Sequence, residues 1–291
     1  MQTADFKALG TDIYLELTTP DFEWVLAALK YEADRFEKKY SRFIASSELC
    51  QLNAQLDKWH AVDEEWLYLL DQYLLVSAQT DQHICLATTA LLEHWGYDAT
   101  YNLKASAPVK TFAPLQLEIK NKRIRFNQPL DFGCLGKGHF LDQCRKILLE
   151  HQVETYLINA GGDLTFKGTK TQKLFLEDPR IKTRVIGECH LRDGFLCASS
   201  PSRRQWGDFH HLINVPDQLP AQAMQAVYVY CEATGLITDA LSTAFFVMGY
   251  EKARRLWPDI SNGYPNAALM LISGEGQVWQ SDNFKVNLFT S

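Results

Sequence analysis

The sequence predicts an α+β fold with a largely antiparallel sheet and packed helices. Apolar residues recur at helical spacing in several long segments, whereas short apolar runs bounded by Gly, Pro and Asp follow one another from about residue 164 to 231. Consecutive strands without intervening helices favour α+β over an alternating α/β fold. No repeat, low-complexity tract or Pro/Ser-rich linker divides the chain. We therefore expect one continuous domain over residues 1–291.

The N-terminal part predicts a strand followed by two helices. Residues 11–18 alternate apolar and polar side chains and then meet a proline, which is typical of a half-buried strand. One helix is predicted over residues 22–36 behind Asp21 as a possible cap, and another over residues 66–74. Residues 41–53, between them, are predicted to form a polar loop.

The second half predicts helices that border a series of strands. A helix is expected over residues 140–148, just after Gly138, and it leads into a compact apolar strand at residues 155–158. A further helix carries Asp239, and a hairpin is expected around residues 274–276. Short strands are predicted at residues 174–176, 184–186 and 227–229.

Composition narrows the class of partner. The chain is 46% hydrophobic and 22% charged, as in an ordinary globular protein with a sizeable core. Its formal net charge is -6 and it has no long Lys/Arg run, which argues against a nucleic-acid surface. Small molecules or proteins are the expected partners.

The cysteine pattern and the first residues indicate the cellular compartment of the protein. The seven cysteines are dispersed and never form a Cys-x-x-Cys pair, so we expect reduced, mostly buried thiols and neither a zinc site nor a disulfide framework. No window approaches the length of a membrane span, and the start has no basic segment leading into an apolar one. We expect a cytoplasmic protein, exported only if a leader has been removed.

Asp239 and Thr243 are the most informative pair for chemistry. Four residues apart on a predicted helix, they place two hard oxygen donors on one face, as a Mg²⁺ ion bound to phosphate would require. Two glycine-rich turns lie upstream, one containing Lys137 and the other spanning residues 159–163. Backbone exposed at such turns can approach a phosphate closely. Together these features predict a nucleotide site.

Each motif also has a purely structural interpretation. The spacing around Lys137 rejects a Walker loop and is compatible with a strand-to-helix turn that carries a solvated lysine. Consecutive glycines in residues 159–163 are most often a tight turn. Asp239 and Thr243 fit equally a solvent-facing carboxylate and a back-bonded hydroxyl. His211 is a possible general base, although a lone histidine is more often structural.

Taken in order, six segments resemble the ApbE family, the FAD:protein FMN transferases. The resemblance spans nearly the whole chain, and the six segments together are specific although each is weak alone. The matching segments are Leu9–Thr11, Ser41–Phe43 with Ser47–Leu49 and Leu52–Asn53, Trp95–Gly96, Asp131–Gly138 with Asp142, Asn159–Asp163, and Thr238–Ala244 with Gly249–Lys252.

The resemblance implies a single domain that binds FAD. It implies Mg²⁺ held by Asp239, Thr243 and a backbone carbonyl near Gly136, with His211 and Asp239 as catalytic residues. Such enzymes split the FAD pyrophosphate, link FMN through its phosphate to a Thr or Ser hydroxyl of a target flavoprotein, and release AMP. The residues implied in FAD binding are Phe43, which would pack on the flavin, and Lys137, Asn159, Ala160, Gly161, Gly162 and Asp163.

Departures from the family pattern concentrate near the expected ligand. Residues 82–89 read Gln-His-Ile-Cys-Leu-Ala-Thr-Thr where the family has Gly-Ala-Phe-Asp-Pro-Thr-Val-Gly, so an acidic residue and a Pro turn are lost. Asn214 stands where the family has Asp, and Ser199–Pro201 replaces Thr-Ser-Gly. Three functions therefore remain open: the Mg²⁺-dependent transferase, a non-catalytic FAD-binding or delivery protein, and an FAD pyrophosphatase that yields FMN and AMP.

Overall fold

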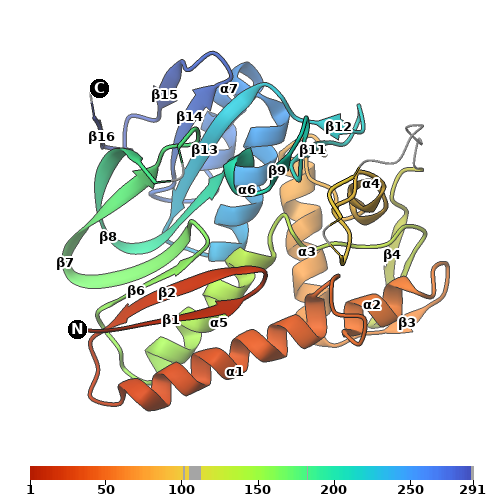
Figure 1. Cartoon of the computed structure of the whole chain (residues 1–291), viewed down its shortest axis with the longest axis horizontal. Helices are drawn as coiled ribbons and strands as arrows, with labels where there is room; N and C mark the ends of the chain where they lie inside the picture. The colour runs from red at the N-terminus through yellow and green to blue at the C-terminus, as the bar shows by residue number, and fades with distance from the viewer. Residues whose placement is uncertain (101, 105–112, 182, 290–291) are drawn as a thin grey trace.

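A nine-stranded antiparallel sheet forms the centre of the computed structural model, which describes residues 1–100, 102–104, 113–181 and 183–289 (Figure 1). The strand order is β1-β2-β6-β7-β8-β13-β14-β15, and β16 pairs with β8. Every neighbouring pair is antiparallel. The predicted α+β architecture is confirmed. The strands are β1 (Gln2–Ala8), β2 (Thr11–Leu17), β6 (Tyr156–Ala160), β7 (Asp163–Glu177), β8 (Val185–Ser199), β13 (Met224–Cys231), β14 (Ala268–Ser273), β15 (Val278–Gln280) and β16 (Val286–Leu288).

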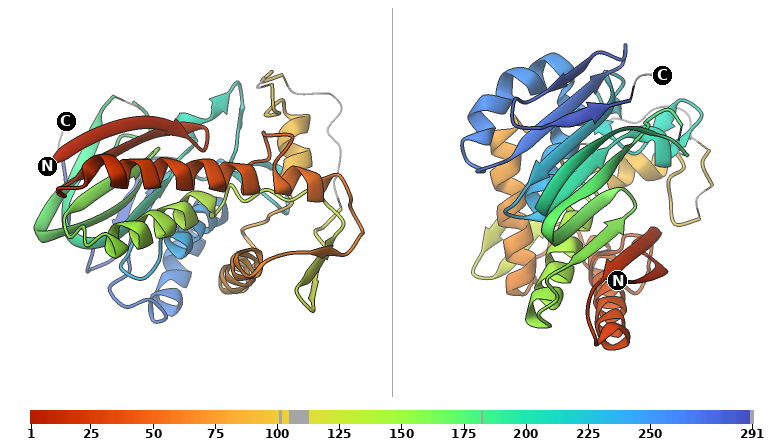
Figure 2. Two further views of the ribbon diagram at one scale, coloured as in Figure 1. Left: turned by 90° about the horizontal axis from the view of Figure 1, so that it is seen from below. Right: turned by 90° about the vertical axis from the view of Figure 1, so that its left-hand side faces the viewer.

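Helices pack against the sheet, and the most central one is α6. It contacts β8 and β13 on one side and α3 and α5 on the other, and it is buried almost all round, which explains its uniformly apolar sequence. The helix α1 packs on α5, and α7 packs on β14 (Figure 2). The helices are α1 (Phe22–Tyr40), α2 (Glu48–Asn53), α3 (Glu64–Gln79), α4 (Thr89–His94), α5 (Gly136–Glu150), α6 (Gly235–Met248) and α7 (Tyr250–Ser261), with a 3₁₀ turn η1 (Pro201–Arg203).

Three small sheets extend the framework. One is three-stranded and lies beyond α2, and the other two are two-stranded and follow η1 along the chain. The strands are β3 (His60–Ala61), β4 (Leu117–Lys120) and β5 (Arg123–Phe126), then β9 (Gln205–Trp206) with β10 (Phe209–His210), and β11 (Ile213–Asn214) with β12 (Leu219–Pro220).

The long β7–β8 hairpin builds a second core. Its register shifts between Lys167 and Gln172, where β7 holds more residues than β8 does. Beyond this bulge the hairpin continues as a second paired stretch, because a bulge bends a strand and increases its twist. Its apolar side chains join others from the sheet and from the C-terminal segment in one buried cluster, separate from the main core. Members of the second core include Leu164, Leu174, Leu176, Leu196, Tyr228 and Phe284.

The strand predictions were right in place and wrong in length. The run at residues 174–176 lies in β7, and the run at residues 184–186 overlaps the start of β8, which begins at Val185; each of these strands has 15 residues. Residues 168–171, which include a glycine and no apolar side chain, lie in the β7 bulge. The predicted C-terminal hairpin is confirmed by the pairing of β14 with β15.

Three details of the helices differ from the prediction. Residues 41–53 are not all loop, because Ser47 accepts a hydrogen bond from the Cys50 N–H at 3.1 Å and so caps the short helix α2. Helix α5 begins at Gly136, not after Gly138. Asp21 precedes α1, but its side chain makes no capping hydrogen bond.

Two further observations concern the chain as a whole. Among the described residues, no helix has both the length and the apolar character needed to span a bilayer. All seven cysteines are free, four of them buried and three partly buried, as predicted from their spacing.

Candidate functional site

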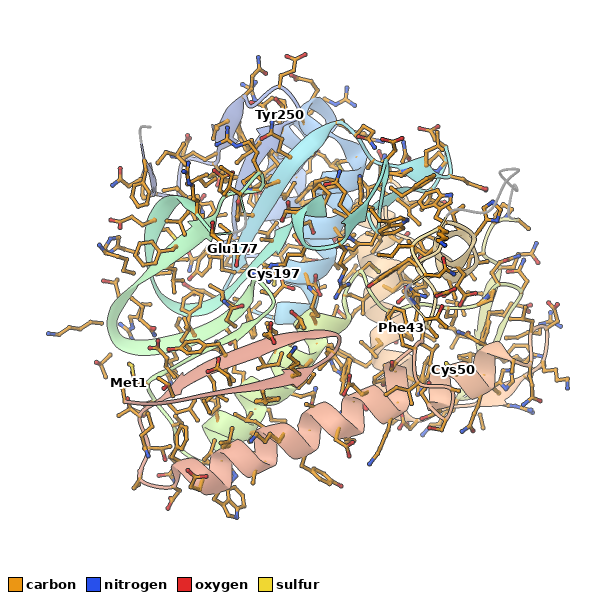
Figure 3. All side chains as sticks on the ribbon, in the orientation of Figure 1. Met1, Phe43, Cys50, Glu177, Cys197 and Tyr250 are labelled. Carbon is orange, nitrogen blue, oxygen red and sulfur yellow. The ribbon has the colours of Figure 1, made fainter. Side chains whose placement is uncertain are left out.

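A cavity of about 260 Å³ opens where the loop after α1, the start of α5 and the helix α6 meet. Its wall also includes the β1–β2 turn and residues from the segments 83–88 and 204–215. Figure 3 shows Phe43 just beyond the end of α1. Segments far apart in sequence therefore meet at this cavity. The predicted site residues in its wall are Phe43, Gly136, Lys137, His211 and Thr243.

Lys137 lies between two buried carboxylates. Its ammonium is ion-paired with Asp163, and it lies 3.8 Å from Oδ1 of Asp239. Asp163 also accepts a hydrogen bond from the Ala198 N–H at 3.0 Å. The lysine side chain is only 20% exposed, so the alternative of a solvated lysine in an ordinary turn is wrong.

Asp239 is fixed where α5 and α6 cross. Its Oδ2 accepts a hydrogen bond from the Gly138 N–H at 2.9 Å, and the residue is 2% exposed. The helices approach so closely that a Cβ on Gly138 would lie 2.1 Å from the Gly235 carbonyl oxygen. The solvent-facing alternative for Asp239 is therefore wrong. Gly138 is needed for this helix contact.

The first turn of α6 is capped by Asp142 of α5. This carboxylate accepts hydrogen bonds from the Thr234 hydroxyl at 2.8 Å, the Gly235 N–H at 2.7 Å and the Leu236 N–H at 2.9 Å. Two of these bonds pair backbone N–H groups that have no partner within the helix, and negative charge is also favoured at a helix N-terminus. Burial raises the pKa of the Asp142 carboxyl.

Asp239 and Thr243 lie one turn apart on α6. No described residue donates a hydrogen bond to Oδ1 of Asp239, and Thr243, one turn later, lines the cavity. The Thr243 hydroxyl lies 3.4 Å from that of Ser199. Within the described residues no three His, Cys, Asp or Glu side chains cluster in a way that could hold a metal. A cation here would therefore rely on hydroxyl and main-chain oxygens as well as on Asp239.

His211 lines the cavity, whereas its neighbour His210 is structural. His210 is bonded to the Ala221 carbonyl at 3.0 Å and accepts the Leu212 N–H at 3.2 Å. Burial, followed by the positive charge of Arg204, lowers the pKa of His211 well below its ordinary value. The imidazole is therefore neutral at neutral pH and able to accept a proton.

Asn214 makes no bond to either histidine. Its amide donates to Asp217 at 2.6 Å.

The turn at residues 159–163 faces a different space. Gly161 and Gly162 have φ values of 66° and 103°, and the Gly162 N–H is bonded to the Asn159 side chain at 2.8 Å, which confirms the predicted turn. Asn159, Gly161 and Gly162 line a second cavity of about 360 Å³, and Ala160 is buried in the core. Asp163 alone connects this turn to Lys137. Binding roles for the turn remain predictions.

One wall feature was not singled out from the sequence. The buried guanidinium of Arg42 pairs with Asp131 at 3.0 Å and lies 4.0 Å from the Phe43 ring centroid. Arg42 lies inside the Ser41–Phe43 segment that resembles the family, which could have identified it from the sequence. Residues 83–85 and Thr88, from the segment that departs from the family pattern, also line the cavity. The departure thus changes a wall of the site.

Comparisons with known proteins agree with this architecture. Residues 9–265 match the model of the ApbE family. The FAD:protein FMN transferase of Salmonella typhimurium is 20% identical, with 96% of this chain and 82% of the relative covered. The Escherichia coli K12 protein of the same name is also 20% identical, with 88% and 80% covered.

Solved structures show the same fold. The ApbE protein of Thermotoga maritima superposes with a TM-score of 0.84 at 24% identity, covering 97% of both chains. The flavin transferase ApbE of Vibrio cholerae gives a TM-score of 0.78 at 17% identity, covering 97% of this chain and 98% of that one. Since the family model covers most of the sequence, the chain belongs to the ApbE family.

Proposed function

We propose that this protein is a Mg²⁺-dependent FAD:protein FMN transferase. The observation that carries the proposal is the convergence of Lys137, Thr243 and His211 on one cavity, with Asp239 directly behind the lysine. Relatives that align over most of this chain bear the name FAD:protein FMN transferase. The acceptor would be a Thr or Ser hydroxyl of a target flavoprotein.

The oxygen donors fit a hard cation. Oδ1 of Asp239, the Thr243 hydroxyl and the carbonyl of Gly136 are the atoms that would hold Mg²⁺, which prefers oxygen ligands and keeps several waters. The Gly138 N–H holds the other Asp239 oxygen and so fixes the carboxylate orientation. When bound, Mg²⁺ would neutralise charge that develops on the pyrophosphate.

The remaining residues bind and orient the substrates. Lys137 supplies positive charge to the phosphates, and the Phe43 ring offers an aromatic surface to the flavin. Neutral His211 takes the proton of the acceptor hydroxyl. That oxygen bonds to the phosphorus of the FMN half, the bond from this phosphorus to the bridging oxygen breaks, and AMP leaves with the bridging oxygen.

The test combines purified protein, FAD, Mg²⁺ and a flavoprotein domain that carries a Ser/Thr-Gly-Ala-Ser/Thr acceptor segment. We expect Mg²⁺-dependent release of AMP and a gain of FMN mass on the acceptor, followed by chromatography and mass spectrometry. AMP and free FMN without acceptor labelling would identify a pyrophosphatase instead. Bound, uncleaved FAD under every metal condition would identify a flavin-binding or delivery protein.

A further inference from the structure

The second cavity, of about 360 Å³, shares no lining residue with the first. Tyr14 and Glu16 of β2 and Leu157 of β6 form one side of it, and residues 172–177 of β7 form the other. Adjacent residues of a strand point their side chains to opposite faces. A cavity lined by six consecutive residues is therefore bounded by the backbone edge of the strand. Figure 3 labels Glu177, the last residue of β7 and the end of this edge.

This edge of β7 is unpaired among the described residues. β6 pairs only with residues 163–167 of β7, before the bulge. Beyond the bulge, residues 172–177 pair with β8 on one side and with no described strand on the other. An open strand edge presents a row of backbone donors and acceptors that another extended chain can pair with.

Two hydrogen bonds show which residues face the cavity. The Asp178 N–H donates to the Arg184 carbonyl at 2.9 Å, on the β8 side. The preceding carbonyl, of Glu177, accepts from the Tyr228 hydroxyl at 2.5 Å, away from β8. Backbone groups alternate between the two edges along an antiparallel strand. The register shift between Leu176 and Glu177 places its extra residue in β8, so the alternation along β7 continues through it. The N–H and C=O of Lys173 and Phe175 therefore face the same side as the Glu177 carbonyl, which Tyr228 already occupies.

The free edge ends beside the transfer site. Glu177, at the end of the edge, is ion-paired with Arg203. The Arg203 guanidinium nitrogen Nε lies 3.7 Å from the position that a Cβ on Gly162 would take. The next residue, Asp163, is the ion-pair partner of Lys137. A peptide paired with this edge of β7 would therefore extend toward Lys137, which the proposed function places at the phosphates of FAD.

The geometry points to this edge as the docking site of the acceptor protein, an inference that rests on the proposed transferase function. An extended segment of the acceptor adds to β7 along Lys173 and Phe175 and delivers its Thr or Ser hydroxyl at the Lys137 end. Backbone pairing of this kind supplies affinity with little demand on side-chain identity. One enzyme can then modify acceptors that share only a short motif.

Phe175→Pro tests the docking directly. Proline removes the N–H that faces the cavity and leaves the β8-facing groups of the neighbouring residues intact, so the protein still folds. We expect the KM for the acceptor to rise about tenfold or more, as the loss of a backbone pair and the bulk of the ring imply. FAD affinity and the melting temperature should stay close to those of the unchanged protein. Phe175→Ala, which keeps the N–H, should leave the acceptor KM within about threefold.

Each other outcome has a defined meaning. Transfer by Phe175→Pro with an unaltered acceptor KM overturns the docking site alone, whereas absence of transfer by the unchanged protein overturns the proposed function. Weaker FAD binding by Phe175→Pro would place part of the nucleotide in this cavity, and a stable dimer that the acceptor does not dissociate would place a second copy there. Either result overturns the inference.

A photo-crosslinking measurement covers the case in which the proline variant fails to fold. A benzophenone side chain in place of Phe175, a residue that is 52% exposed, should capture the acceptor protein. The same probe at Tyr31 on α1, which is 72% exposed, is the matched control and should capture none. Equal capture at both positions, or none at position 175, overturns the docking site.

Discussion

At the scale of residues, the site is defined by how each polar atom is shared. The Lys137 ammonium forms an ion pair with Asp163 and lies 3.8 Å from Oδ1 of Asp239. Oδ2 of Asp239 accepts a hydrogen bond from a backbone N–H, whereas Oδ1 receives no hydrogen bond from the described residues. A buried carboxylate oxygen without a hydrogen bond is costly unless a cation approaches it. Asp239 therefore has a different role from Asp142, whose oxygens are engaged by three donors.

We expect Asp239→Asn to reduce FMN transfer by at least about a hundredfold, because the amide offers a cation no negative charge. The fold should persist, since the amide oxygen can still accept the Gly138 N–H. Asp142→Asn is the matched control: it weakens the α6 cap and lowers stability by about 1 kcal/mol, yet it should keep transfer activity. Acceptor mass and thermal melting measure the two effects. Full transfer by Asp239→Asn would contradict the cation site.

His211 predicts a pH dependence. Because burial holds its pKa well below 6.5, the neutral base persists as pH falls through 6.5, and kcat/KM should decline only at lower pH. His211→Gln should lower kcat by about 10²–10⁴-fold and remove this acid limb. An acid limb centred at or above pH 6.5 would argue against His211 as the base.

The same shift has a consequence for stability. The folded pKa of His211 lies below the unfolded value, so the unfolded chain binds more protons in acid. The contribution of this residue to stability is complete above about pH 6.5 and is lost as pH falls below it.

At the scale of elements, the crossing of α5 and α6 sets the position of the site. Gly138→Ala should lower stability by at least about 3 kcal/mol or prevent folding, because the new methyl group meets the Gly235 carbonyl. Helix propensity alone would favour alanine by about 1 kcal/mol, so the steric effect decides the sign. Gly263→Ala, whose new methyl carbon would lie 3.5 Å from the Ile260 carbonyl oxygen, is the control and should change stability little. Urea titration distinguishes the two, and a stabilised Gly138→Ala would refute the close approach.

The sequence predicted elements wherever a local pattern was long and regular. The helices α1 and α3 follow from apolar spacing alone, and α6 follows from its motif. The lengths of β7 and β8 did not, because residues 168–171 interrupt the pattern without ending the strand. The folding of the hairpin over a second core depends on contacts with Leu196 and Phe284, which no local window contains.

The sequence did not predict that the candidate site residues border two separate cavities. Both glycine turns were expected at one ligand, but Asn159 and the glycines after it border the second cavity, whereas Gly136 and Lys137 border the first. Local sequence identifies a turn and does not say which cavity it borders. The buried Arg42–Asp131 pair joins residues 89 positions apart and was likewise beyond a local pattern.

At the scale of the whole molecule, both cores share one sheet, so we expect the chain to unfold in a single transition. FAD with Mg²⁺ should raise the melting temperature, since a ligand at about 100 times its Kd adds about 2.7 kcal/mol to stability. Mg²⁺ removal by a chelator should reduce this gain, and Asp239→Asn should be insensitive to the chelator. Scanning calorimetry that resolves two transitions, only one of them responsive to FAD, would contradict this picture.

The first cavity draws its wall from Leu9 near the start of the chain and from Thr243 and Val247 near its end. During synthesis, Thr243 and Val247 leave the ribosome long after Leu9, so the cavity cannot form until the intervening residues have been made. A flavin nucleotide therefore cannot guide the early steps of folding, which must close the sheet through contacts distant in sequence. It can capture only the finished chain. The cellular supply of flavin should thus govern how long the folded protein survives, and not how fast it forms.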